Sequence, residues 1–200
     1  IQFFLMDGYI YADGKKAMWA QTYRFDNIFS NFVYEAKIKR SKGDLYSANT
    51  MFIRMGSSVG GQNEWTPGYY FEYTNDQHFS IWKVTAPGVA VSLQPWTYNK
   101  NIKSGEWNKL KIIANGVTLK FFINGYWVAT VKDAVYSKGF VGLGFYDQGL
   151  TGDRYKVDWA KLHEICAADE TTGAISAEQQ SLNDAANAAA PIGNINGIFR

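Results

Sequence analysis

Residues 107–131, WNKLKIIANGVTLKFFINGYWVATV, decide the fold. They contain two Asn-Gly pairs, Asn115-Gly116 and Asn124-Gly125, and each pair separates runs that are rich in apolar residues. Asn-Gly tolerates positive φ at both central positions of a tight turn, which makes it the strongest short-range signal for a β-hairpin. Two such pairs so close together predict a meander of three antiparallel strands.

The rest of the body repeats this pattern of short strands and turn signals. Residues 32–39 alternate apolar and polar side chains, and residues 68–75 and 78–84 flank the polar turn at Asn75-Asp76. Aromatic residues make up 16% of the chain, and they favour pleated, half-buried surfaces. The sequence thus predicts an all-β sandwich or barrel. Further strands are predicted at 51–56, 139–146 and 154–165.

Net charge and cysteine content argue against several functional classes. The formal net charge is +2 and no run of Lys or Arg occurs, so neither nucleic acid nor an anionic membrane is an expected partner. One cysteine, Cys166, cannot form an internal disulfide or a zinc site by itself. No segment is long and apolar enough to span a bilayer.

The chain is expected to consist of a domain at residues 1–164 and a tail at residues 165–200. The tail is rich in small and polar residues, unlike the aromatic body. Ser176-Ala-Glu-Gln179 matches a helix capping box, and Pro191 is a stop signal. A short helix is therefore predicted at about 176–190.

Residues 104–146 carry a pattern that is typical of a known superfamily. The pattern runs Gly-x-Trp-Asn from Gly105, a strand, two Asn-Gly turns, and Gly-x-Val-Gly-Leu from Gly139. The stretches DNIFSNFVYEAKIKR (26–40) and RYKVDWAKL (154–162) agree with it. Over about residues 7–164 the chain resembles the concanavalin A-like, or laminin G-like, jelly-roll superfamily.

The resemblance implies an all-β fold, a two-sheet antiparallel jelly-roll sandwich, here with the short C-terminal helical tail. It also implies ligands on the concave face or rim loops, and a secreted, periplasmic or cell-surface location. The superfamily includes 3-keto-disaccharide hydrolase-like domains as well as sugar-binding and adhesion modules. Fold alone therefore does not choose the function.

The carboxylates and histidines do not form a recognisable catalytic set. Glycoside hydrolysis usually uses two carboxyl groups that flank the bond, and the strand spacings Glu-x-Asp-x-Glu and Glu-x-Asp-x-x-Glu are absent. Glu72 stands alone in its strand, while His78 and His163 fit solvated positions at a turn and a strand end. We therefore expect no catalytic residue.

Aromatic and charged side chains point to a binding site instead. Tyr70 and Glu72 share one face of their strand, and Arg54 lies mid-strand among apolar neighbours, where a charge needs a partner such as Glu72. Rings would stack on sugar C–H faces while Arg and Glu bond hydroxyls. The alternative is a structural Arg54–Glu72 pair in a filled groove. The predicted ligand-binding residues are Arg54, Tyr70, Glu72 and Trp82 on strands, with Trp65 and Trp96 from loops.

A calcium site is a further possibility that the resemblance suggests. Laminin G-like folds often hold calcium on rim loops, and Asp147 and Asp153 flank the loop DQGLTGD. The alternative is an ordinary Asp/Gly turn. No cofactor other than Ca²⁺ is expected.

The sequence thus predicts a non-catalytic carbohydrate-binding or adhesion module whose partner is a glycan or polysaccharide. One alternative is a structural or assembly subunit of a surface structure. Its self-association contacts would be the apolar ends, Ile1–Met6 or Pro191–Arg200. A second alternative is a saccharide hydrolase of the 3-keto-disaccharide type.

Overall fold

The computed structural model describes most of the body of the chain. All described residues lie in the first of two units, Ile1–Cys166. The expected tail helix at 176–190 lies outside the described residues. None of the described residues belongs to a helix that could cross a membrane. The structure describes residues 3–6, 9–13, 17–23, 27–41, 44–56, 66–86, 88–148 and 154–165. It describes their side chains in 27–41, 44–56, 66–86, 88–146 and 155–165.

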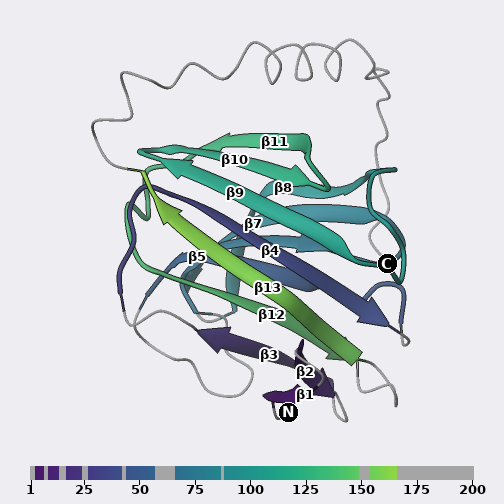
Figure 1. Cartoon of the computed structure of the whole chain (residues 1–200). Helices are drawn as coiled ribbons and strands as arrows, with labels where there is room; N and C mark the ends of the chain where they lie inside the picture. Colours follow the sequence, from purple (N-terminus) through teal and green to yellow (C-terminus); the bar gives the residue numbers. More distant parts are fainter. Residues whose placement is uncertain are drawn as a thin grey trace. The chain divides into compact units, whose positions relative to one another are not determined.

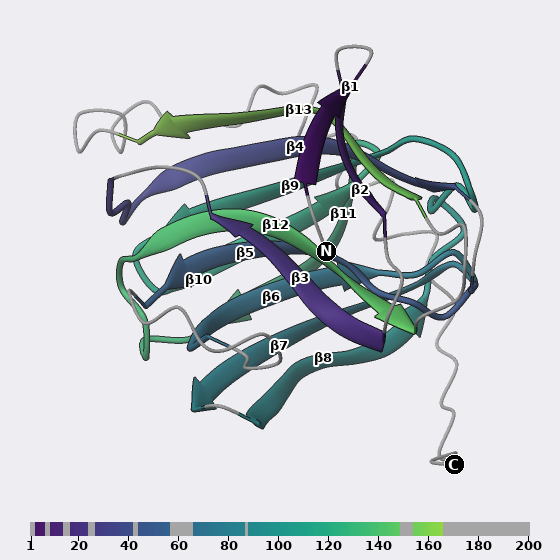
Figure 2. The same ribbon diagram turned by 90° about the horizontal axis from the view of Figure 1, so that it is seen from below.

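Thirteen described strands form two antiparallel sheets that face each other (Figures 1 and 2). This confirms the predicted two-sheet antiparallel sandwich. The seven-stranded sheet has the order β1 (Phe3–Met6), β2 (Tyr9–Asp13), β13 (Arg154–Glu164), β4 (Phe32–Ser41), β9 (Asn108–Asn115), β10 (Thr118–Ile123) and β11 (Tyr126–Lys132). The six-stranded sheet has the order β3 (Ala17–Tyr23), β12 (Phe140–Gln148), β5 (Asn49–Met55), β6 (Gly68–Tyr73), β7 (His78–Ala86) and β8 (Val89–Tyr98).

The predicted meander is present as β9, β10 and β11, but its first turn differs from the expectation. Asn124 and Gly125 both have positive φ, as a type I′ turn requires. In the first hairpin Asn115 pairs with Thr118, so the central residues are Gly116 and Val117. Positive φ falls there on Gly116 alone, as in a type II′ turn with glycine at its first central position.

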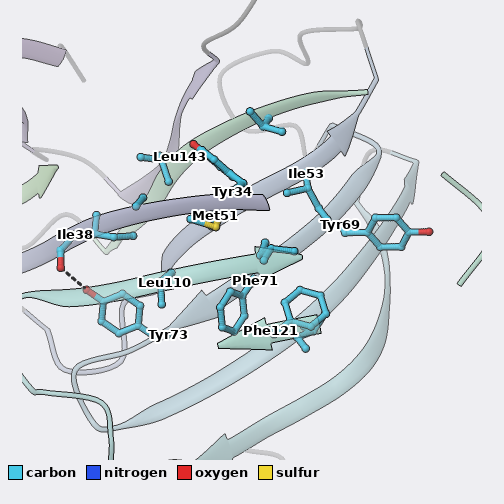
Figure 3. Close-up of a cluster of buried hydrophobic side chains, with 14 of the residues drawn as sticks. Tyr34, Ile38, Met51, Ile53, Tyr69, Phe71, Tyr73, Leu110, Phe121 and Leu143 are labelled. Atoms are coloured by element: carbon cyan, nitrogen blue, oxygen red, sulfur yellow. Dashed lines mark hydrogen bonds between the residues drawn. The ribbon is translucent and has the colours of Figure 1, made fainter. Parts of the chain in front are cut away.

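The hydrophobic core lies between the sheets and is rich in aromatic rings. On β4 every second residue is buried, from Phe32 to Arg40, and the residues between are half-buried. Phe71 of the six-stranded sheet contacts Phe121 of the seven-stranded sheet, with ring centroids 5.1 Å apart. Figure 3 shows these rings beside Tyr73, whose hydroxyl donates to the carbonyl of Ile38 at 3.5 Å. Rigid rings fill the space between two pleated faces with few side chains.

A β-bulge interrupts β5 near its end. Gly142 of β12 pairs with Phe52 and Phe140 pairs with Met55, so β5 carries one extra residue between these pairs. Arg54, in this interval, has a φ of 51°, a left-handed conformation that is uncommon for a residue with a side chain. Gly139 packs on the bulge, because a Cβ there would lie 2.4 Å from the carbonyl carbon of Arg54 and from the carbonyl oxygen of Met55.

Gly139→Ala is expected to lower the free energy of unfolding by about 1 to 3 kcal/mol, because the added methyl group collides with backbone that cannot rotate away. Urea denaturation followed by tryptophan fluorescence measures the change. Gly56→Ala is the matched control, since its Cβ would meet only the Pro67 carbonyl oxygen at 4.0 Å. Equal stability of the two variants would contradict the close approach at Gly139.

Candidate functional site

One face of the six-stranded sheet turns away from the core and carries a mixed set of polar and aromatic side chains. Because strand side chains alternate, Met51, Phe71 and Ile81 face the core while their neighbours face the other way. We call this second surface the Glu72 face. Its side chains on the three central strands are Thr50 and Phe52 of β5, Tyr70 and Glu72 of β6, and Ser80 and Trp82 of β7.

A chain of hydrogen bonds crosses the Glu72 face from β5 to β7. Thr50 Oγ1 donates to Glu72 Oε1 at 3.2 Å, and Ser80 Oγ donates to Glu72 Oε2 at 3.2 Å. Trp82 Nε1 donates to Ser80 Oγ at 2.8 Å. The register brings these groups together, because Glu72 lies directly opposite both Thr50 and Ser80. One carboxyl group thus orients two hydroxyls and, through Ser80, the indole of Trp82.

The environment of Glu72 favours its neutral form. Its side chain is only 3% exposed, and burial raises its pKa from 4.5 to about 7. The hydrogen bonds from Ser80 and Thr50 stabilise the carboxylate and limit the rise. The carboxyl group is therefore poised between its two protonation states near neutral pH.

The margin of the Glu72 face is more accessible than its centre. Trp82 is half-buried and lies opposite Ser92 of β8. On β8, Trp96 is 42% exposed and Tyr98 is 59% exposed. Tyr98 is the register partner of His78, and the two rings lie 5.9 Å apart. Two exposed aromatic rings thus lie on the edge strand β8, next to the strand that carries the half-buried Trp82.

β8 is the last strand of its sheet, and its pairing with β7 is irregular. The register shifts at three places, and Pro95 lies within the strand just before Trp96. Proline and bulges are typical of sheet edges, where they re-aim side chains. The expected position of Trp96 in a loop is corrected, since it lies within β8.

The structure corrects the predicted Arg54–Glu72 pair. The bulge turns Arg54 away from the Glu72 face, and its guanidinium donates instead to the backbone carbonyls of Ser30 and Tyr136. Burial lowers the pKa of Arg54, and nearby Tyr69 opposes that shift. Strict alternation would have placed Arg54 beside Phe52, and the extra residue breaks that alternation.

The other predicted residues divide into three groups. Tyr70, Glu72 and Trp82 lie together on the Glu72 face, and Trp96 lies on the neighbouring strand β8. Trp65 and Asp153 lie outside the described residues. Asp147 belongs to β12, where it pairs with Met18, and its side chain is not described. Across the described residues, no group of three metal-ligating side chains comes together.

Thr50 and Tyr98 are site residues that the sequence interpretation missed. Alternation from Phe52 would have placed Thr50 on the same face. Tyr98 had no such signal, because its position depends on the irregular register between β7 and β8.

Several solved structures have the same fold as this chain. The carbohydrate-binding module CBM66 from Bacillus subtilis is 17% identical, with a TM-score of 0.63 over 82% of this chain and 91% of that chain. A β-1,3-1,4-glucanase (lichenase) from a mouse hindgut metagenome is 14% identical, with a TM-score of 0.59 over 82% and 83%. A legume lectin-like domain from Entamoeba histolytica is 12% identical, with a TM-score of 0.56 over 82% and 87%. The fold that the resemblance implied is confirmed.

The family assignment is more specific than the fold. Residues 4–161 match the model of the 3-keto-alpha-glucoside-1,2-lyase-like domain, and the chain belongs to this family. No curated protein matches the chain in sequence.

Glu72→Gln is expected to remove a pH dependence of stability. The folded pKa, about 7, lies above the unfolded value of 4.5, so the folded state binds the proton more tightly. This contribution to stability is complete below pH 4.5 and is lost as the pH rises through 7, by about 3 kcal/mol in all. Unfolding free energies of both proteins at pH 4.5, 6 and 8 measure it. Parallel curves for the wild type and the variant would rule out a raised pKa.

Proposed function

We propose that the chain is a carbohydrate-binding module whose ligand lies along β7 and β8, at the accessible margin of the Glu72 face. The observation that carries the proposal is the hydrogen-bonded chain from Thr50 through Glu72 and Ser80 to Trp82 of β7. The neighbouring strand β8 carries two exposed aromatic rings. Aromatic rings offer flat apolar surfaces to the C–H faces of a sugar. The proposal gives Trp82, Trp96 and Tyr98 this stacking role.

Glu72 acts in this proposal as a positioning residue. Its carboxyl group is buried and both oxygens accept hydrogen bonds from hydroxyls, so it holds Ser80 in place. Ser80 in turn accepts the indole N–H of Trp82 and fixes the orientation of that ring. An oriented ring loses less conformational freedom when a ligand binds, which favours affinity.

The geometry of Glu72 supports a binding role over hydrolysis. A general acid must reach the glycosidic oxygen, and the usual hydrolytic mechanism needs a second carboxyl group across the bond. Glu72 is 3% exposed, and its register neighbours are the hydroxyls of Thr50 and Ser80. In one of the two adjacent rows, Phe52, Tyr70 and Trp82 bring no carboxyl group.

The similar structures support a saccharide as the ligand. One is named a carbohydrate-binding module, a second a glucanase and a third a legume lectin-like domain. The family name also refers to a glucoside. An extracytoplasmic location and an adhesive role belong to the same proposal. The exoplasmic/lumenal domain of VIP36 has the same fold, with 10% identity and a TM-score of 0.58 over 82% of each chain.

Trp82→Ala is expected to weaken binding to neutral oligosaccharides at least about tenfold, because it removes the stacking ring that Ser80 orients. An array of neutral glycans identifies the oligosaccharide that the wild type binds, and titration calorimetry measures the affinity for it. Trp127→Ala is the matched control: Trp127 lies on the other sheet, and its indole likewise donates to a hydroxyl, that of Thr130, at 3.0 Å. Equal affinities of the wild type and Trp82→Ala would overturn the proposed site.

Cleavage of a 3-keto-α-glucoside, the activity in the family name, is a second candidate function. The observation that favours it is Glu72, because a carboxyl group with a pKa of about 7 can accept and donate a proton near neutrality.

Incubation with methyl 3-keto-α-glucoside, followed by NMR, separates the two candidates. The binding proposal predicts that the spectrum stays that of the intact ketoside and that Glu72→Gln behaves like the wild type. Consumption of the ketoside by the wild type but not by Glu72→Gln would make the Glu72 face an active site.

Assembly through the chain ends stays a prediction. Of the two ends, residues Phe3–Met6 form β1 at the edge of the seven-stranded sheet, and Pro191–Arg200 lie outside the described residues.

A further inference from the structure

The outward face of the seven-stranded sheet carries a dense set of lysines. The alternation that buries Tyr34 and Ile112 sends Lys37 and Lys39 of β4, and Lys109 and Lys111 of β9, to the opposite side. Lys37 lies directly opposite Lys109 across the two strands. Directly opposite residues share a face of the sheet, so their ammonium groups add to one surface.

Three further strands extend this surface, which we call the lysine face. Lys156 of β13 pairs with Lys39 of β4. Lys161 of β13 lies opposite Glu35 of β4, which in turn lies opposite Lys111 of β9. On the other side of β9, β10 brings Lys120 and β11 brings Lys132. The lysine face thus spans five adjacent strands.

Carboxylates neutralise only part of this charge. Eight lysines stand on the described part of the face, and three of them pair with carboxylates. Lys111, Lys120, Lys132 and Lys161 have no carboxylate partner among the described residues. The ion pairs are Lys37–Asp158 at 2.7 Å, Lys39–Glu106 at 3.0 Å and Lys109–Glu35 at 3.9 Å.

Aromatic rings hold several of these lysines against the sheet. Lys111 Nζ lies 4.4 Å from the ring centre of Phe122, and Lys161 Nζ lies 4.9 Å from that of Trp159. Such contacts hold the ammonium groups over their rings while leaving their charge intact. A ligand therefore meets charges that are already in place, which lowers the entropic cost of binding.

We propose that the lysine face binds an anionic polysaccharide, in addition to the site proposed on the Glu72 face. The net charge of the chain is only +2, but exposed charges are screened beyond about 10 Å at 0.1 M salt, so a ligand responds to the face it touches.

Two other polyanions fit this surface less well than a flexible polysaccharide. A sheet is twisted, and a flexible chain can follow its curvature, whereas a planar membrane touches it over a smaller area. Single-stranded nucleic acid binds by stacking bases on open rings, and the rings of Phe122 and Trp159 are covered by lysines.

Binding to dextran sulfate, with neutral dextran as the uncharged counterpart, tests the proposal. The wild type should bind dextran sulfate more tightly than neutral dextran, with an affinity for dextran sulfate that falls as salt rises from 50 to 300 mM. The triple variant Lys111→Gln, Lys120→Gln, Lys161→Gln should bind at least about tenfold more weakly. Titration calorimetry measures the affinities, and circular dichroism checks that the variants keep the fold.

The matched control is Lys100→Gln, Lys103→Gln, Lys138→Gln, which removes the same charge from exposed lysines outside the lysine face. Its affinity should stay within about twofold of the wild type. Equal losses in both triple variants would overturn the proposal, as would no binding to dextran sulfate at 50 mM salt.

Tighter binding to phosphatidylserine vesicles, or to oligothymidylate, would also overturn it and would identify a membrane or nucleic-acid surface instead. Retained binding of neutral oligosaccharides by the lysine-face variant separates this proposal from the one for the Glu72 face. Failure of either proposal leaves the other standing.

Discussion

Alternation of side chains across each strand is the constraint on which the structure depends. Each sheet has two faces, and this one rule separates the aromatic core from the Glu72 face on one sheet and from the lysine face on the other. Within the core, rings such as Phe71 and Phe121 meet across the two sheets. The hydrophobic contribution of these rings must offset the cost of features that disfavour folding, such as a buried carboxyl group and a left-handed arginine.

Glu72 shows how the structure limits the unfavourable free energy of a buried carboxyl group. A buried carboxylate without partners would destabilise the fold strongly, but here both oxygens accept hydroxyl hydrogen bonds and the raised pKa lets a proton neutralise the charge. The same arrangement rigidifies Ser80 and Trp82. Burial and orientation are two results of a single register, in which Thr50, Glu72 and Ser80 lie side by side on three strands.

The sequence predicted the parts of the structure that depend on local patterns. The strands, the meander and the common face of Tyr70, Glu72 and Trp82 follow from alternation and turn residues. The Arg54–Glu72 pair was wrong because an extra residue in β5 reverses the alternation, and no local pattern signals that bulge. The first hairpin turn is displaced to Gly116-Val117 because strand register, not the Asn-Gly pair alone, sets its position. The lysine face forms no run in the sequence, since its lysines occupy every second position of separate strands.

The irregular edge strand β8 has a consequence for the protein at high concentration. An unpaired strand edge is a template on which a second chain can add, the first step toward fibrils. Three register shifts and a proline deprive β8 of the regular, evenly spaced donors and acceptors that such growth requires. The same irregularity that leaves Trp96 and Tyr98 exposed therefore protects this edge against aggregation, even though it displays large apolar rings.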